Sequence, residues 1–170
     1  MVREPGQRAD IAWRRFQTEA MLTFSRVHQQ ILLRTAQRLE DAGIAGITPA
    51  QANALIVLFN ARRPIQAQQL ARELGVSDVT VSRLIRRMEA DGWVERSPDP
   101  LDRRALRLQT TARARAMFPA LVQVSNQVLD DLFGALEREE LRAAFGIVTR
   151  IQAGLVSGPA PAASAGDDPA

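Results

Sequence analysis

Arginine, hydroxyl and apolar side chains alternate regularly between residues 77 and 90. At 100° per residue, one narrow arc of a helix over residues 78–90 contains Val81, Leu84, Ile85 and Met88, and this arc is the predicted buried side. The opposite side and its margins carry Val79, Thr80, Ser82, Arg83, Arg86 and Arg87, with Ser77 just before the helix. Arginine binds guanine edges and phosphates, hydroxyl groups bind phosphates or bases, and an apolar group contacts thymine methyls. The pattern predicts a helix that reads the major groove of DNA, and the alternative is an ordinary surface helix rich in arginine.

A second group of arginines follows a segment rich in proline and aspartate. The flanking segments 93–97 and 105–109 suit extended structure, which predicts a hairpin with Arg103 and Arg104 at its far end. Arginines held there can enter a narrow minor groove, where the negative potential is deepest. Asp102 would repel phosphate, so we interpret it as the residue that holds Arg104 in one orientation. The alternative is a solvated turn without a role.

The sequence before residue 78 also predicts the helix and the turn that position these side chains. A first helix is predicted over residues 65–74, with a small residue, Ala71, where the second helix crosses closely. Gly75 suits the left-handed backbone that ends a helix. Ser77 then offers its hydroxyl as the N-cap of the helix at 78–90. Together these features predict a helix-turn-helix followed by a wing.

Four further helical segments surround this unit in the sequence. Residues 11–42 contain neither proline nor glycine and have apolar residues at helical spacing, and Thr48 is the expected N-cap of a helix over residues 48–61. A third helix is predicted over residues 111–136, where Pro119 should bend the helix or delay its regular start. The last, over residues 139–155, has one apolar face: Leu141, Phe145, Val148, Ile151 and Leu155.

The composition limits the function classes. The chain has 170 residues, no cysteine and a single histidine, His28, so we expect no disulfide, no thiolate chemistry and no metal site. It also lacks tyrosine, a phosphate-binding glycine loop and clustered carboxylates on a folded face, so we expect no catalytic residue, no cofactor and no enzymatic activity. No hydrophobic run approaches the length of a membrane span and no signal peptide is visible, so we expect a cytoplasmic protein without a membrane partner.

The positive charge is concentrated in the predicted DNA-reading segment. All 22 basic residues are arginine and the net charge is only +3. Residues 62–115 hold 12 arginines against 7 acidic residues, whereas the rest of the chain holds 10 against 12. Such a distribution favours attraction to phosphate.

The run from about Thr48 to Ala116 resembles the MarR family of winged-helix transcriptional regulators. The resemblance is carried by ITPAQANALIVL, by QLARELGVSDVTVSRLIRRMEADGWVERSPDPLDRRALRL and, most specifically, by the wing motif D-P-x-D-R-R-A from Asp99 to Ala105. It implies an obligate bacterial homodimer that binds palindromic DNA, usually as a repressor, and many members release the DNA when they bind a small phenolic or amphipathic ligand. On this resemblance Val79, Thr80, Ser82, Arg83 and Arg86 would face the major groove and Arg104 the minor groove. The chain departs from the family at Thr110, Thr111 and Ala114, where leucine, threonine and glycine are common, and loss of that glycine favours a continuous helix.

The expected fold class is therefore mainly α with a small β-hairpin wing: a winged helix-turn-helix flanked by N- and C-terminal dimerisation helices. The expected domains are an N-terminal dimerisation helix (1–46), the DNA-binding region (47–110), C-terminal dimerisation helices (111–157) and a disordered tail (158–170). The terminal helices carry more apolar surface than a small winged helix can cover, which favours a homodimer over a larger monomeric core.

The expected function is a sequence-specific regulator of transcription, usually a repressor and less often an activator, that binds a palindromic operator in double-stranded DNA as a homodimer. A small-molecule effector would act between the helical dimer region and the winged helix, and Trp13, Phe24, His28 and Asn53 are its candidate contacts; each of them also suits ordinary packing or surface exposure. The alternative function is a winged helix that coats DNA without sequence preference or docks onto another protein.

Overall fold

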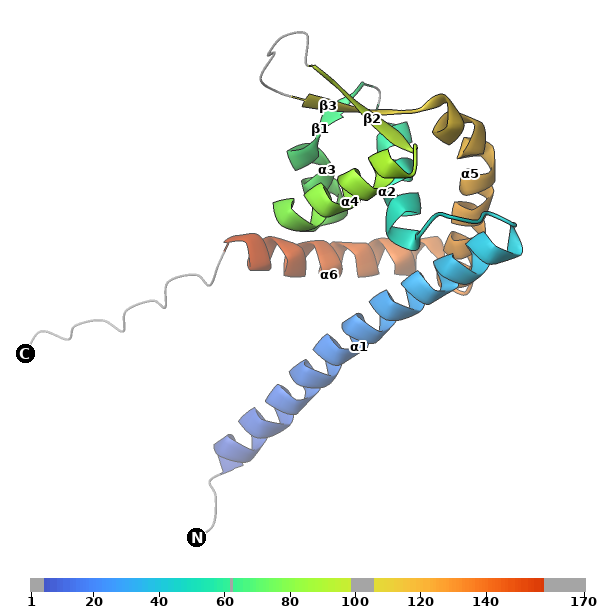
Figure 1. The fold of residues 1–170 in the computed structure, drawn as a ribbon. Coiled ribbons are helices and arrows are strands. Elements are labelled where there is room, and N and C mark those ends of the chain that lie inside the picture. The colour runs from blue at the N-terminus through green and yellow to red at the C-terminus, as the bar shows by residue number, and fades with distance from the viewer. Residues whose placement is uncertain (1–4, 62, 99–105, 158–170) are drawn as a thin grey trace, which may run out of the picture. The chain divides into compact units, whose positions relative to one another are not determined.

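The computed structural model describes residues 5–61, 63–98 and 106–157 of the chain (Figure 1). They fall into two compact units, one ending at residue 130 and the other beginning at residue 131. Helices predominate and one small sheet accompanies them, which confirms the predicted fold class. The predicted turn residues Asp102, Arg103 and Arg104 and the tail 158–170 lie outside the described residues.

The first two helices of the larger unit are α1 (Pro5–Asp41) and α2 (Pro49–Asn60). Helix α1 begins six residues before the predicted start. Helix α2 begins as predicted, with Thr48 as N-cap and Pro49 at the first helical position. The backbone amide of Gln51 donates to Thr48 Oγ1 at 3.3 Å, and the amide of Thr48 donates to Gln51 Oε1 at 2.8 Å. This reciprocal pair is a capping box, which satisfies two of the amides left free at a helix start.

The helix-turn-helix consists of α3 (Ala67–Leu74) and α4 (Asp78–Ala90). Gly75 between them has φ = 65°, in the left-handed region that glycine adopts without strain, as predicted. The predicted start of the first helix at residue 65 was wrong. Ile65 and Gln66 instead form a short strand, β1 (Ile65–Gln66), because buried Ile65 pairs with Leu108 in the wing.

The wing is a three-stranded antiparallel sheet in the order β1–β3–β2, with β2 (Val94–Pro98) and β3 (Leu106–Thr110) as its long strands. The predicted hairpin is confirmed, with each strand shifted by one residue along the chain. The register pairs Val94 with Thr110 and Arg96 with Leu108. Sheet pairing therefore joins the segment before α3 to the wing that follows α4.

One hydrophobic core supports this unit. Its fully buried members include Leu55 from α2, Leu70 from α3, Ile85 and Met88 from α4, and Trp93 just before β2. Each large side chain removed from water contributes about 1.5–3 kcal/mol, so these contacts fix the position of α4 against its neighbours.

Helix α5 (Ala112–Phe133) follows the wing directly. The Thr111 hydroxyl donates to the carbonyl of Gly92 at 2.7 Å and accepts from the amide of Ala114 at 3.2 Å. Ala114 is fully buried within a continuous helix, in line with the predicted effect of losing glycine there. The helix runs across Pro119, so its regular start is not delayed.

The second unit contains the last turn of α5 and helix α6 (Arg138–Ser157). The predicted apolar face of α6 has exposed Phe145, Val148, Ile151 and Leu155. In the larger unit, α1 likewise exposes large apolar side chains, among them Trp13, Phe16 and Phe24. Over the described ranges, none of these helices combines the length and hydropathy needed to span a bilayer.

Candidate nucleic-acid interface

Helix α4 has one buried side and one open side, as its periodicity predicts. Val81, Ile85 and Met88 are at most 1% exposed, and Leu84 is partly buried beside them. On the other side Val79 is 62% exposed, and Thr80, Arg83 and Arg86 are exposed as well. An apolar side chain so open on a helix that is otherwise well packed is available to a partner surface.

The start of α4 is organised by two hydroxyl groups. The amide of Thr80 donates to Ser77 Oγ at 3.2 Å, which confirms Ser77 as the N-cap, and the two hydroxyl oxygens lie 2.9 Å apart. The remaining amides of this first turn and the positive end of the helix suit a phosphate group. Asp78 in the same turn is also exposed, and its negative charge opposes the binding of an anion there.

The three arginines of α4 are placed differently. Arg83 is exposed and makes no hydrogen bond or ion pair with any residue that the structure describes. Arg86 donates from Nε to the carbonyl of Ser82 at 3.3 Å, and its side chain stays exposed. Arg87 donates from Nε to Asp91 Oδ2 at 3.0 Å, and this contact directs it toward the C-terminal end of the helix.

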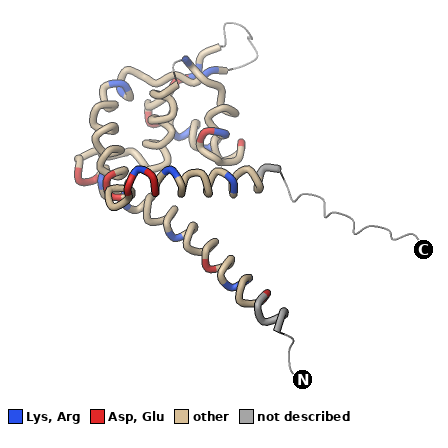
Figure 2. The backbone as a smooth tube through the Cα atoms, turned by 180° about the vertical axis from the view of Figure 1, so that it is seen from behind, with Lys and Arg blue, Asp and Glu red and all other residues tan. Residues whose placement is uncertain are grey.

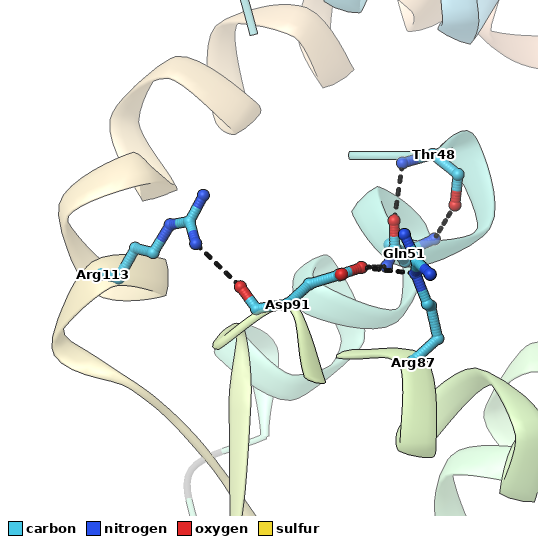
Figure 3. A network of polar contacts seen from close by, with 5 residues as sticks. All are labelled: Thr48, Gln51, Arg87, Asp91 and Arg113. Atoms are coloured by element: carbon cyan, nitrogen blue, oxygen red, sulfur yellow. Dashed lines mark hydrogen bonds and ion pairs between the residues drawn. The ribbon is translucent and has the colours of Figure 1, made fainter. Parts of the chain in front are cut away.

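Asp91 is the centre of a polar network that joins three helices (Figure 3). Its Oδ2 accepts from Arg87 Nε and from Gln51 Nε2, the latter at 2.8 Å. Its backbone carbonyl accepts from a guanidinium nitrogen of Arg113 at 2.8 Å. The Arg113 guanidinium also lies over the Trp93 ring, 4.1 Å from the ring centroid. The C-terminal end of α4 is therefore held by both α2 and α5.

Side chains also connect α4 to the wing. Glu89 near the end of α4 forms a 3.0 Å ion pair with Arg96 on β2, and both side chains are about one-third exposed. Across the hairpin, Gln109 Nε2 donates to Ser97 Oγ at 2.9 Å. The ion pair joins β2 to α4, and the hydrogen bond joins the two strands of the hairpin. The contacts predicted for Arg103 and Arg104, and the orienting role predicted for Asp102, lie outside the described residues.

Basic residues exceed acidic ones around α3, α4 and the base of the wing. The described residues between 63 and 115 include nine arginines and five acidic residues. The other described residues hold nine arginines and nine acidic residues, and the two signs are interspersed along α1 (Figure 2). This asymmetry gives the winged helix-turn-helix the attraction to phosphate that the sequence predicts.

A cavity of about 400 Å³ lies behind the helix-turn-helix in the larger unit. Its walls come from α1, α2, α5 and the end of α3 and consist mainly of Ile31, Ile56, Val57, Leu74, Leu121, Val124, Val128 and Leu129. Of the four predicted effector contacts, Asn53 lines this cavity. Trp13, Phe24 and His28 are exposed on α1 before Ile31, its first residue in the cavity lining, and Trp13 stacks on Phe16 with ring centroids 5.5 Å apart.

Sequence reasoning missed the Asp91 network and most of the cavity. Gln51 carried a usable signal, because glutamine three residues after a threonine N-cap is the pattern of a capping box. Asp91 and Arg113 carried none, since their contacts depend on how distant helices pack. Metal-binding clusters of histidine and carboxylate side chains are absent from the part of the chain that the structure describes.

Comparison with known proteins agrees with this geometry. A family model described as the MarR family matches residues 45–105. The transcriptional repressor MprA of Escherichia coli (strain K12) is 31% identical over 124 residues, which is 72% of this chain and 69% of MprA. Its name describes a regulator of transcription and not an enzyme.

Two solved structures show the same fold. The S. aureus MepR–DNA complex has a TM-score of 0.69 at 21% identity, covering 79% of this chain and 96% of the MepR chain. Bordetella bronchiseptica BpsR, described in a structure on the regulation of its DNA binding by 6-hydroxynicotinic acid, has a TM-score of 0.66 at 23% identity. The match covers 76% of this chain and 90% of the BpsR chain. With the exposed face of α4, the wing and a repressor relative at this level of identity, the chain belongs to the MarR family of transcriptional regulators.

Proposed function

We propose that the protein is a repressor that binds a palindromic operator as a homodimer. The observation that supports this most is the burial pattern of α4: its inner side is buried in the core, while Val79, Thr80 and Arg83 are exposed. In the proposed complex these residues, with Ser77, Ser82, Arg86 and Arg87, contact the major groove. Arg103 and Arg104 at the wing contact the minor groove, with Asp102 orienting Arg104. MepR, which has the same fold, binds DNA in its solved complex.

The proposed dimer uses the terminal helices. We assign dimerisation to residues 1–46 and 111–157 and DNA binding to residues 47–110. This assignment is supported by aromatic side chains that are exposed in the single chain, Trp13 and Phe16 on α1 and Phe145 on α6. Phe145 is 71% exposed. Large apolar side chains exposed along a helix are costly in water, and such surfaces mark interfaces. Two copies would then present two recognition helices to successive turns of the duplex. Because the proposed partner is operator DNA, we propose a cytoplasmic location.

The proposed effector site is the cavity behind the helix-turn-helix. Residues from α1, α2 and α5 line it together with Glu73 and Leu74 from α3, so an occupant touches the DNA-reading unit and its supporting helices at once. BpsR, a protein of the same fold, has its DNA binding regulated by a small molecule. An occupant weakens operator binding only if it binds the non-binding arrangement of the protein more tightly than the DNA-bound one.

Selection of bound duplexes from a random pool tests the proposal. The enriched duplex is then titrated by fluorescence anisotropy against a scrambled duplex at one salt concentration. We expect a palindrome that binds about 10³-fold or more tightly than the scramble, as for specific protein–DNA complexes. Affinity that depends on salt but not on sequence would contradict the proposal and would favour a winged helix that coats DNA without reading it.

A further inference from the structure

The cavity behind the helix-turn-helix has apolar walls and an acidic edge. Aliphatic side chains from α1, α2 and α5 form most of its lining. Glu73 of α3 is the one ionisable residue in that lining among the residues that the structure describes, and no arginine joins it. An apolar cavity with a few polar groups at one side is the usual form of a small-molecule site.

The carboxylate of Glu73 has no counter-ion within the described part of the chain. It is exposed, and it forms no ion pair or hydrogen bond with the residues described there. Glu73 lies in the last turn of α3, where the partial negative charge of a helix C-terminus adds to its own. Arg72 is in the same turn but does not line the cavity. The electrostatic potential at this edge therefore favours a positive group over a negative one.

The other polar groups of the lining are neutral. The Thr35 hydroxyl donates to the carbonyl of Ile31 at 2.8 Å, so its oxygen is left as an acceptor. Asn53 and Ser125 offer an amide and a hydroxyl that can both donate and accept. None of these groups replaces the positive charge that an anionic ligand would need for pairing.

We propose that this cavity takes a cationic amphipathic molecule, with its hydrocarbon body among the aliphatic side chains and an ammonium or amidinium group at Glu73. The inference rests on the proposed function, in which the cavity is the effector site, and it specifies the chemical class of the effector. Because Glu73 belongs to α3, which packs against α4, the ion pair forms directly on the helix-turn-helix. The rest of the ligand contacts the supporting helices.

Three probes of one shape and different charge test this inference: phenylbutylamine, phenylbutanol and phenylbutyrate. Their affinity for the DNA-free protein is measured by isothermal titration calorimetry at neutral pH. We expect the ammonium probe to bind most tightly and the carboxylate probe most weakly. Glu73→Gln keeps the size of the side chain and removes its charge, so it should weaken the ammonium probe about fivefold, as for one partly exposed ion pair. It should leave the alcohol unchanged.

Glu19→Gln on α1 is the matched control, because Glu19 is also exposed but lies outside this cavity's lining. Its affinities for all three probes should equal those of the wild type. The inference is overturned if no probe binds, if the carboxylate probe binds as tightly as the ammonium probe, or if Glu73→Gln and Glu19→Gln have the same effect. These titrations contain no DNA, so their failure is distinct from a failure of operator selection, which would count against the proposed function itself.

Discussion

Gln51 donates a hydrogen bond of 2.8 Å from Nε2 to Oδ2 of Asp91, a residue forty positions later in the chain (Figure 3). The same glutamine closes the capping box at the start of α2 through its Oε1. Gln51 is 2% exposed, and these two hydrogen bonds satisfy both the Oε1 and the Nε2 of its buried amide. Asp91 follows the last residue of α4 and also accepts from Arg87. One glutamine thus connects the start of α2 to the end of α4.

Asp91→Ala is expected to lower the free energy of unfolding by about 1–3 kcal/mol, because the substitution leaves the buried Gln51 amide without its acceptor. Urea unfolding followed by circular dichroism measures the change. Asp130→Ala near the end of α5 removes an equivalent charge from an exposed position and should stay within about 0.5 kcal/mol of the wild type. Equal stability of the two variants would show that the contact contributes nothing.

Arg83→Ala is expected to weaken operator binding by about 1–3 kcal/mol and to relax base preference at one position of each half-site. The reason is that Arg83 is exposed on α4 and forms no bond with the described residues that would compete with a base. Binding-site selection with the variant reveals the lost preference. Arg26→Ala on α1 is the matched control and should change neither quantity; an unchanged consensus for Arg83→Ala would remove this residue from direct readout.

Arg104→Ala is expected to reduce operator affinity by about 1–3 kcal/mol, as for the loss of one good groove contact. This prediction rests on the wing motif of the sequence, since Arg104 lies outside the described residues. Anisotropy titration at two salt concentrations separates a groove contact from a general loss of charge. Arg107→Ala on β3 is a poor control because that side chain has a contact of its own, whereas exposed Arg63 is suitable. If Arg63→Ala and Arg104→Ala weaken binding equally, the wing acts through charge alone.

Local signals made helix α4 predictable from the sequence. Gly75 and Ser77 mark its start by backbone preference and capping, and the spacing of Val81, Ile85 and Met88 identifies its buried side. Both bounds, Asp78 and Ala90, agree with the structure. The open face of α4 followed from the same periodicity, because whatever is not buried by a regular helix must face outward.

Features that depend on distant contacts were not predictable in this way. The two-residue strand β1 exists because Ile65 pairs with Leu108, and nothing within residues 65–74 signals that pairing. The cavity combines Glu73 with side chains from three other helices, so its acidic edge appears only once those helices are packed. Choosing effector contacts by residue type selected Trp13, Phe24 and His28, which α1 places on its exposed part.

Phe145→Glu is expected to shift the protein from dimer to monomer, because a carboxylate would replace an aromatic ring at the proposed interface. The ring is 71% exposed in the single chain, so the fold of one copy should tolerate the substitution. Sedimentation velocity across a concentration series measures the shift. Ala143→Glu introduces the same charge on the opposite side of α6 and should leave the dimer intact. A dimer with unchanged affinity in Phe145→Glu would exclude this face of α6 from the interface.

Arg113 connects the start of α5 to the end of α4, so its removal should loosen that junction. Its guanidinium donates to the Asp91 carbonyl and covers the ring of buried Trp93. We expect Arg113→Ala to lower the free energy of unfolding by about 1–2 kcal/mol through loss of the cation–π contact and the hydrogen bond. Arg113→Lys should recover part of this loss, since an ammonium keeps the charge but not the planar stacking.

The measurement uses Trp13→Phe as the background, because this leaves Trp93 as the sole tryptophan. Trp93 fluorescence then reports both the local environment of the indole and global unfolding in urea. The protein with Arg113 intact should be the most stable, Arg113→Lys intermediate and Arg113→Ala the least stable. Both substitutions should change the emission before any denaturant is added. An Arg113→Ala protein with unchanged emission and stability would show that α5 is held against α4 without this residue, and the core contacts of Ala114 and Leu121 would then be sufficient.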